Sequence, residues 1–143
     1  MPTQTAPAAT PSEPVDLVTA DLALIFALAD AAKQMAERAS QENDPNVRAA
    51  LRNQAKVANE QAGLLIARGA VTLFNGVPAD ALAQIAEAVD GVSEAIASIQ
   101  KAKKAISFVT SLVGVAGAVL LGDWAGVVKA ITALAAKKAA GAA

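Results

Sequence analysis

Apolar residues in the middle of the chain recur at alternating steps of three and four, and this spacing constrains the fold more than any other feature. The seam consists of Leu82, Ile85, Val89, Val92, Ile96, Ile99, Lys103 and Ile106. Such a heptad pattern predicts a long helix that packs along this seam against a second helix. Glu87, Glu94 and Lys101 fall opposite the seam, on the face predicted to be in water. The packing partner is either another helix of the chain or a second subunit.

Helical periodicity covers most of the chain, between recognisable start and stop signals. Asp44–Pro45 places a capping residue before a proline at the first helical position, and Asn75–Gly76 and Gly122–Asp123 put glycine just after a helix end. No strand alternation is present. The sequence predicts an all-α fold, an elongated four-helix bundle with long helices and a hydrophobic C-terminal helical hairpin. The predicted helices lie at about 15–41, 45–74, 79–121 and 124–139.

The first residues differ in composition from the rest. Four of the six prolines fall within residues 1–14, which we predict to be a disordered Pro/Ala/Thr-rich tail. Residues 15–143 are predicted to form a single α-helical domain. The start has no basic region of the kind that opens a secretory signal. We expect cytoplasmic synthesis without a removable signal, with membrane association or export by a signal-less route left open.

Cysteine and histidine are both absent, which excludes thiol nucleophiles, disulfides, Cys/His zinc sites and imidazole acid–base catalysis. Carboxylates gather on the predicted third helix as Asp80, Glu87, Asp90 and Glu94. Since Glu87 and Glu94 lie opposite the seam, a solvated surface explains them better than a metal or acid–base site. The sequence therefore predicts a protein that is not an enzyme and has no cofactor.

Charge is distributed unevenly along the chain. Residues 1–100 carry twelve acidic and six basic side chains, whereas residues 101–143 carry six lysines and Asp123 alone on the acidic side. A basic, apolar C-terminal third suggests an anionic lipid surface as partner, although scattered solubilising lysines explain it as well. Without an arginine-rich stripe or interleaved aromatic residues, nucleic acid is not expected to bind.

Residues 105–122 contain no charge and are apolar around the whole helix. This segment has the minimum length for a membrane span. It is interpreted as the central helix of a soluble bundle, as a segment that inserts conditionally with the last helix, or as a permanent anchor. Small residues mark a predicted close-packing or membrane-contacting face, beside a capping aspartate and the sole tryptophan: Ser107, Ser111, Gly114, Ala118, Gly122, Asp123 and Trp124.

Two functions follow from these features. The first is a non-enzymatic helical assembly or binding protein that self-associates, or docks a protein partner, through the seam. The second is a membrane-active protein whose segment 105–136 is sequestered in solution and inserts into lipid. The arrangement of amphipathic helices followed by a hydrophobic hairpin is similar in outline to α-helical pore-forming toxins, which implies the second function.

Overall fold

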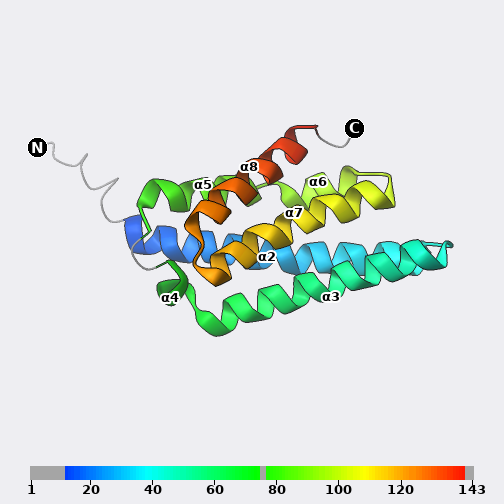
Figure 1. Cartoon of the computed structure of the whole chain (residues 1–143), viewed down its shortest axis with the longest axis horizontal. Helices are drawn as coiled ribbons and strands as arrows, with labels where there is room; N and C mark the ends of the chain where they lie inside the picture. Colours follow the sequence, from blue (N-terminus) through cyan, green and yellow to red (C-terminus); the bar gives the residue numbers. More distant parts are fainter. Residues whose placement is uncertain (1–11, 75–76, 141–143) are drawn as a thin grey trace, which may run out of the picture.

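The computed structural model describes residues 12–74 and 77–140, and these residues form an elongated arrangement of helices without a strand among them (Figure 1). The prediction of an all-α protein is confirmed. Helix bounds along the chain are α2 Ser12–Gln41, α3 Pro45–Arg68, α4 Ala70–Phe74, α5 Ala79–Val89, α6 Val92–Ser98, α7 Ala102–Leu121 and α8 Trp124–Ala140.

The two longest helices, α2 and α3, lie side by side and run in opposite directions (Figure 1). Their connection is formed locally, as the sequence predicts. The Asp44 side chain accepts hydrogen bonds from the backbone N–H groups of Asn46 at 2.8 Å and Val47 at 3.4 Å, and Pro45 occupies the first turn. Alanine supplies much of the buried surface of this pair, which lets the two backbones approach closely: Ala20, Ala27, Ala31, Ala32, Ala39, Ala55, Ala58 and Ala62.

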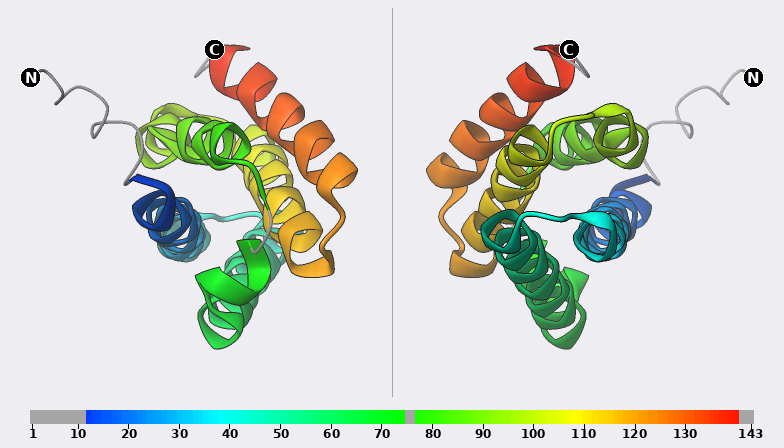
Figure 2. Two further views of the ribbon diagram at one scale, coloured as in Figure 1. Left: turned by 90° about the vertical axis from the view of Figure 1, so that its left-hand side faces the viewer. Right: turned by 90° about the vertical axis from the view of Figure 1, so that its right-hand side faces the viewer.

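The remaining helices complete the core around this pair. Helices α5 and α6 pack against α2, while α7 packs mainly against α3 and α8. Viewed end-on, α2, α3, α7 and the α5–α6 segment surround the interior, and α8 lies on the outer side of α7 (Figure 2). Larger apolar side chains fill the centre, among them Leu24, Leu28, Met35, Leu51, Leu65, Phe74, Ile85, Ile96 and Leu112.

The predicted helix 45–74 is confirmed as helix from Pro45 to Arg68, but it is not continuous, because the chain breaks at Gly69. This residue has a φ of +78°, which side-chain-bearing residues rarely adopt. Its N–H bonds to the carbonyl of Leu65, so α3 ends at Arg68 and α4 restarts at Ala70. The predicted stop at Asn75–Gly76 lies outside the described residues.

The predicted continuous helix 79–121 is also wrong, because the chain divides it into α5, α6 and α7. At the first break Gly91 takes a left-handed φ of +73°. At the second break Ile99 and Lys101 are both extended. A heptad pattern specifies which side chains face the core, and it does not by itself require that the backbone between them remain helical.

The outer boundaries of the domain agree more closely with prediction. Gly122 has a left-handed φ of +71° at the end of α7, and α8 begins at Trp124. Helix α2 begins at Ser12, so the last three residues of the predicted tail 1–14 are helical. Residues 1–11 of that tail lie outside the described residues.

Candidate functional site

The seam lies inside the chain. Its first six members, from Leu82 to Ile99, are buried, and they belong to α5, α6 and the turn that follows. Both helices pack against α2. The partner left open by the sequence is therefore an internal helix, and the six apolar side chains present no surface to a second subunit in this conformation.

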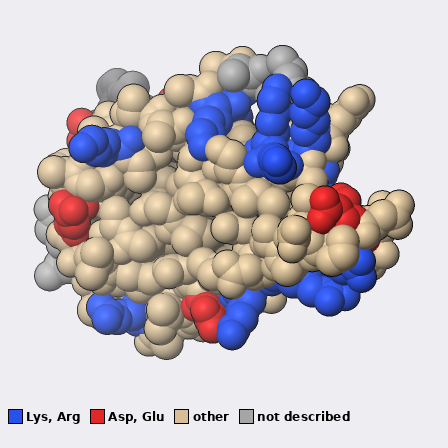
Figure 3. Space-filling view, turned by 45° about the vertical axis from the view of Figure 1, so that its right-hand side comes forward, with Lys and Arg blue, Asp and Glu red and all other residues tan. Residues whose placement is uncertain are grey.

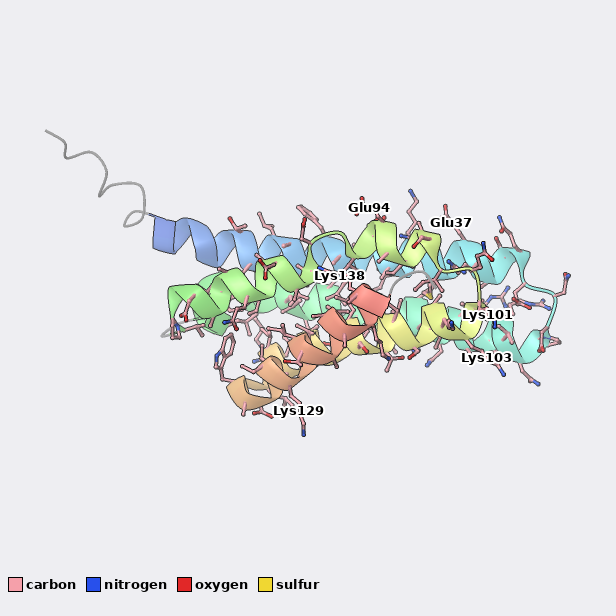
Figure 4. The ribbon with its side chains drawn as sticks, turned by 90° about the horizontal axis from the view of Figure 1, so that it is seen from above. Glu37, Glu94, Lys101, Lys103, Lys129 and Lys138 are labelled. Carbon is pink, nitrogen blue, oxygen red and sulfur yellow. The ribbon has the colours of Figure 1, made fainter. Side chains whose placement is uncertain are left out.

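The last two seam positions behave differently because the second break changes the direction of the chain. Lys103 is exposed in the first turn of α7, where Figure 4 shows it at the edge of the molecule. Ile106 is half-buried against the core. The Lys103 side chain is thus in water, outside the part of the predicted seam that packs in the core.

Helix α7 has one buried face and one open face. Its buried face packs into the core through Ala105, Phe108, Val109, Leu112, Val115, Ala116 and Val119. On the open face Ser107, Thr110, Gly114 and Leu121 are exposed. A Cβ atom added to Gly114 or Gly122 would meet no atom within 4 Å. These two glycines therefore do not make the predicted close helix contact within the chain.

Three other residues of that predicted row make hydrogen bonds within the fold. Ser107 accepts hydrogen bonds from the Lys137 ammonium through its carbonyl at 3.0 Å and its hydroxyl at 2.5 Å. Ala118 is half-buried against the core, and its carbonyl accepts from the N–H of Asp123 at 3.1 Å. Ser111 is half-buried, and its hydroxyl bonds back to the Ser107 carbonyl.

The turn between α7 and α8 exposes apolar surface beside basic side chains. Leu121 is 83 % exposed, and Trp124 and Val128 lie one turn apart on α8, with Val128 46 % exposed. Arg68 reaches this turn from α3 and donates a hydrogen bond to the Leu120 carbonyl at 3.3 Å. Lys129 projects outward from the second turn of α8 (Figure 4). We call this the corner surface, made up of Arg68, Leu121, Trp124, Val128 and Lys129.

Asp123 is the acidic residue of the corner, and it acts as the cap of α8. Its Oδ1 accepts a hydrogen bond from the Gly126 N–H at 3.0 Å, and its carbonyl accepts from the Val127 N–H at 2.9 Å. A Cβ atom added to Gly126 would lie 2.5 Å from Asp123 Oδ2. The capping role predicted for Asp123 is therefore confirmed, and Gly126 is the residue that makes room for it.

Basic side chains from distant helices donate hydrogen bonds to the carbonyl groups where α5 and α6 end. The Lys138 ammonium donates to the carbonyls of Glu87, Ala88 and Asp90 at 2.8–3.2 Å. The Arg38 guanidinium donates to the carbonyls of Ile96, Ile99 and Gln100. The last carbonyls of a helix lack the intrahelical partners of the preceding turns and carry partial negative charge. A cation therefore stabilises them both by donating hydrogen bonds and by its charge. These contacts explain how the α5–α6 segment keeps a defined conformation although its helices are interrupted.

The carboxylates singled out in the sequence lie at the surface of the α5–α6 segment. Asp80, Glu87, Asp90 and Glu94 are all exposed. Within residues 12–74 and 77–140 no cluster of three or more acidic side chains is arranged to hold a metal ion.

Sequence reasoning missed Asp21, which is a carboxylate inside the fold. It is 7 % exposed in the middle of apolar α2 surface, and its Oδ1 has no hydrogen-bond partner. Burial raises the pKa of the Asp21 carboxyl above its usual value, because the charged form loses hydration. A single acidic residue within an otherwise apolar helical stretch is the signal that points to it.

Comparison of the chain with known protein families, with curated proteins and with solved structures finds no match. Function is therefore argued from the chain itself. Within the described residues, α7 is the one helix whose length and composition would allow it to cross a membrane, and 39 % of its apolar window is buried in the fold. Core helices of soluble proteins pass the same test, so this property gains weight only together with the corner surface.

Proposed function

We propose that the protein is a non-enzymatic, membrane-active helical protein that binds anionic lipid through its corner surface. The observation that carries this proposal is the 83 % exposure of Leu121 at the α7–α8 turn, where Arg68 bonds to the Leu120 carbonyl and Trp124 and Lys129 lie in the first two turns of α8. Tryptophan favours the headgroup level of a bilayer, and each basic residue near an anionic surface contributes about 1 kcal/mol.

The surrounding face supports the same proposal. In Figure 3 uncharged residues form a broad, continuous area, with lysine and arginine side chains and a smaller number of acidic ones at its edges. Such a distribution suits a surface that lies on lipid, since apolar and small residues meet the interface while the rim meets phosphate groups.

Docking precedes insertion in this proposal, and the second step uses segment 105–136. In solution α7 buries Phe108, Leu112 and Val119, and Lys137 fastens α8 to α7. In water, the proposed inserting segment therefore keeps its apolar side chains packed inside the fold. Insertion moves the buried face of α7 from the protein core into lipid, and the ionised Asp123 opposes it by about 2.5–3.5 kcal/mol if carried to the bilayer centre.

Self-association through the seam ranks second. The six buried seam residues reach another subunit only if α5 and α6 leave α2. A homo-oligomer or a protein partner that uses a different surface is compatible with lipid binding.

Vesicle co-sedimentation of the full chain tests the proposal. Phosphatidylcholine vesicles are compared with and without phosphatidylglycerol, using wild type, Leu121→Ser and the matched control Phe26→Ser. Both substituted side chains are exposed, so neither variant loses core packing. We expect binding to the anionic vesicles, weakened about tenfold by Leu121→Ser and unchanged by Phe26→Ser. Equal binding by the two variants, or no binding by wild type, contradicts the proposal.

A further inference from the structure

A second unexplained surface lies between α2 and the α5–α6 segment, away from the α7–α8 turn. An open groove of about 650 Å³ runs between α2 and the break that separates α5 from α6. Ala23, Phe26 and Ala27 line it from α2, and Val89, Gly91 and Val92 are among the residues that line it from the other side. None of the residues of the corner surface lines this groove, so the two surfaces are separate.

Phe26 is the unusual residue of the groove. It is 65 % exposed, and Leu22, one turn earlier on the same face of α2, is 42 % exposed. The chain has only three phenylalanines, and Phe74 and Phe108 are both buried. Exposed aromatic side chains beside a concave surface are where binding energy concentrates in protein interfaces.

Carboxylates surround this apolar strip. Asp30 from α2 and Glu87, Asp90 and Glu94 from the α5–α6 segment all line the groove. Glu37 extends the acidic edge along α2, and it lies on the same edge of the molecule as Glu94 in Figure 4. Lys103 and Lys129 lie at the opposite edge of that view.

Fewer basic than acidic side chains lie near the groove, and the nearest ones already interact with neighbouring groups of the chain. Lys138 directs its ammonium to the backbone carbonyls at the end of α5. Lys33 is exposed on α2 near Asp30, and it helps to lower the pKa of that carboxyl. Hydrogen bonds from the Ser93 hydroxyl and the Gln34 amide contribute more to the same lowering of the Asp30 pKa. The groove therefore keeps a negative balance.

We propose that this groove binds a cationic amphipathic helix of a partner protein. The apolar face of the helix covers Phe26 and Leu22, and its lysine or arginine side chains pair with Glu87, Asp90 and Glu94. Charge complementarity selects this occupant, because an acidic groove repels anionic lipid and nucleic acid. The groove lies between roughly parallel helices, which is the usual site for a docked amphipathic helix. The proposal does not depend on lipid binding at the corner surface.

Fluorescence anisotropy with a model helix tests this inference. The probe is a fluorescein-labelled leucine–lysine peptide about 18 residues long with one apolar face. The full chain is titrated into it as wild type, Phe26→Ser, Leu121→Ser and the double variant Glu87→Gln/Glu94→Gln. We expect saturable binding to wild type, weakened about tenfold or more by Phe26→Ser and unchanged by Leu121→Ser. The double variant is expected to bind more weakly and with less dependence on salt.

Three results would overturn the inference. The first is that a scrambled peptide of the same composition binds as well as the amphipathic one, which would indicate general attraction between opposite charges. The second is that the peptide binds Phe26→Ser and wild type equally, which would place its site elsewhere. The third is that light scattering shows wild type without peptide to be a dimer that Phe26→Ser dissociates, which would assign the groove to a second copy. Helicity by circular dichroism is expected to be the same in all variants, because each substituted side chain is exposed.

Discussion

The α2–α3 pair and the α5–α8 segment are both helical, but their helix ends are fixed in different ways. Between α2 and α3, Asp44 caps backbone N–H groups two and three residues further along the chain, and Pro45 begins α3. In the second segment, α5 and α6 end against cations that lie about fifty or sixty residues away in the chain. The first pair is thus specified locally, whereas the second depends on completed tertiary structure. Regions of the second kind open and rearrange more readily.

The largest predicted effect removes a long-range cap. Arg38→Met keeps the apolar stem of the side chain and deletes its donors to the carbonyls of Ile96 and Ile99. We expect the free energy of unfolding to fall by about 1.5–3 kcal/mol in urea denaturation, because charged donors to buried carbonyls carry this magnitude. Lys56→Met, at an exposed position of α3, is the control and is expected to change stability by less than about 0.5 kcal/mol. Equal effects of the two substitutions would mean that the distant cap is dispensable.

The next prediction concerns Asp21, a buried carboxylate of α2. Its pKa is raised by burial, so the folded chain holds this proton more tightly than the unfolded chain does. The stability associated with the group is fully present below its usual pKa and is lost as pH rises through the raised value. Asp21→Leu removes an unpaired buried carboxylate and is expected to raise the free energy of unfolding at pH 7 by about 1–3 kcal/mol.

Measurement over a range of pH checks the sign of that effect. The advantage of Asp21→Leu over wild type should be small near pH 3 and should grow as the pH rises. Asp30 provides the opposite case on the same helix, since hydrogen bonds from Ser93 and Gln34 lower its pKa. An advantage that shrinks with rising pH would show that Asp21 is stabilised as the anion.

A smaller effect on stability is expected from replacing a glycine in each of the two regions. Gly91 has a φ of +73° at the break between α5 and α6, whereas Gly63 lies within α3 and a Cβ atom there would meet nothing. Gly91→Ala is expected to destabilise the fold by about 1–2 kcal/mol, because it puts a side chain into the left-handed region. Gly63→Ala is expected to stabilise it by about 0.5–1 kcal/mol. The melting temperatures of both variants check this prediction. If Gly91→Ala also raises the melting temperature, the left-handed conformation at Gly91, and with it the break between α5 and α6, is contradicted.

The smallest predicted effect on stability lies at Asp123. Asp123→Asn keeps a good capping residue and deletes the charge, so we expect little change in the melting temperature. Dye release from anionic vesicles should nevertheless increase, since the charge that opposes insertion is gone. Asp123→Ala serves as the control, because it deletes the cap as well and is expected to cost about 0.5–2 kcal/mol. Unchanged dye release by Asp123→Asn would limit the protein to surface binding.

The sequence predicts the features of the fold that are decided within a few residues. The all-α class, the caps at Asp44 and Asp123 and the turn at Gly122 all follow from local patterns. The breaks after α5 and α6 do not, because the apolar residues on either side keep their heptad spacing and stay buried. Lys138 and Arg38, which cap these ends, carry no local mark of that role.

The candidate sites divide in the same way. Asp123 and Trp124 stand out in the sequence as an acidic residue and the sole tryptophan beside an apolar segment. Arg68 joins them only because α3 and α7 end at the same place in the fold. Phe26 resembles any other apolar residue of an amphipathic helix, and its exposure follows from how α5 and α6 lie against α2.

Quenching of Trp124 by brominated lipid tests the central claim most directly, because this residue is the only tryptophan and belongs to the corner surface. Bromine atoms on the acyl chains quench an indole only when it reaches the membrane interior or its boundary. Anionic vesicles should quench wild type and Phe26→Ser strongly and Leu121→Ser weakly. Emission from wild type that stays unquenched in excess anionic lipid would contradict lipid binding by the α7–α8 corner.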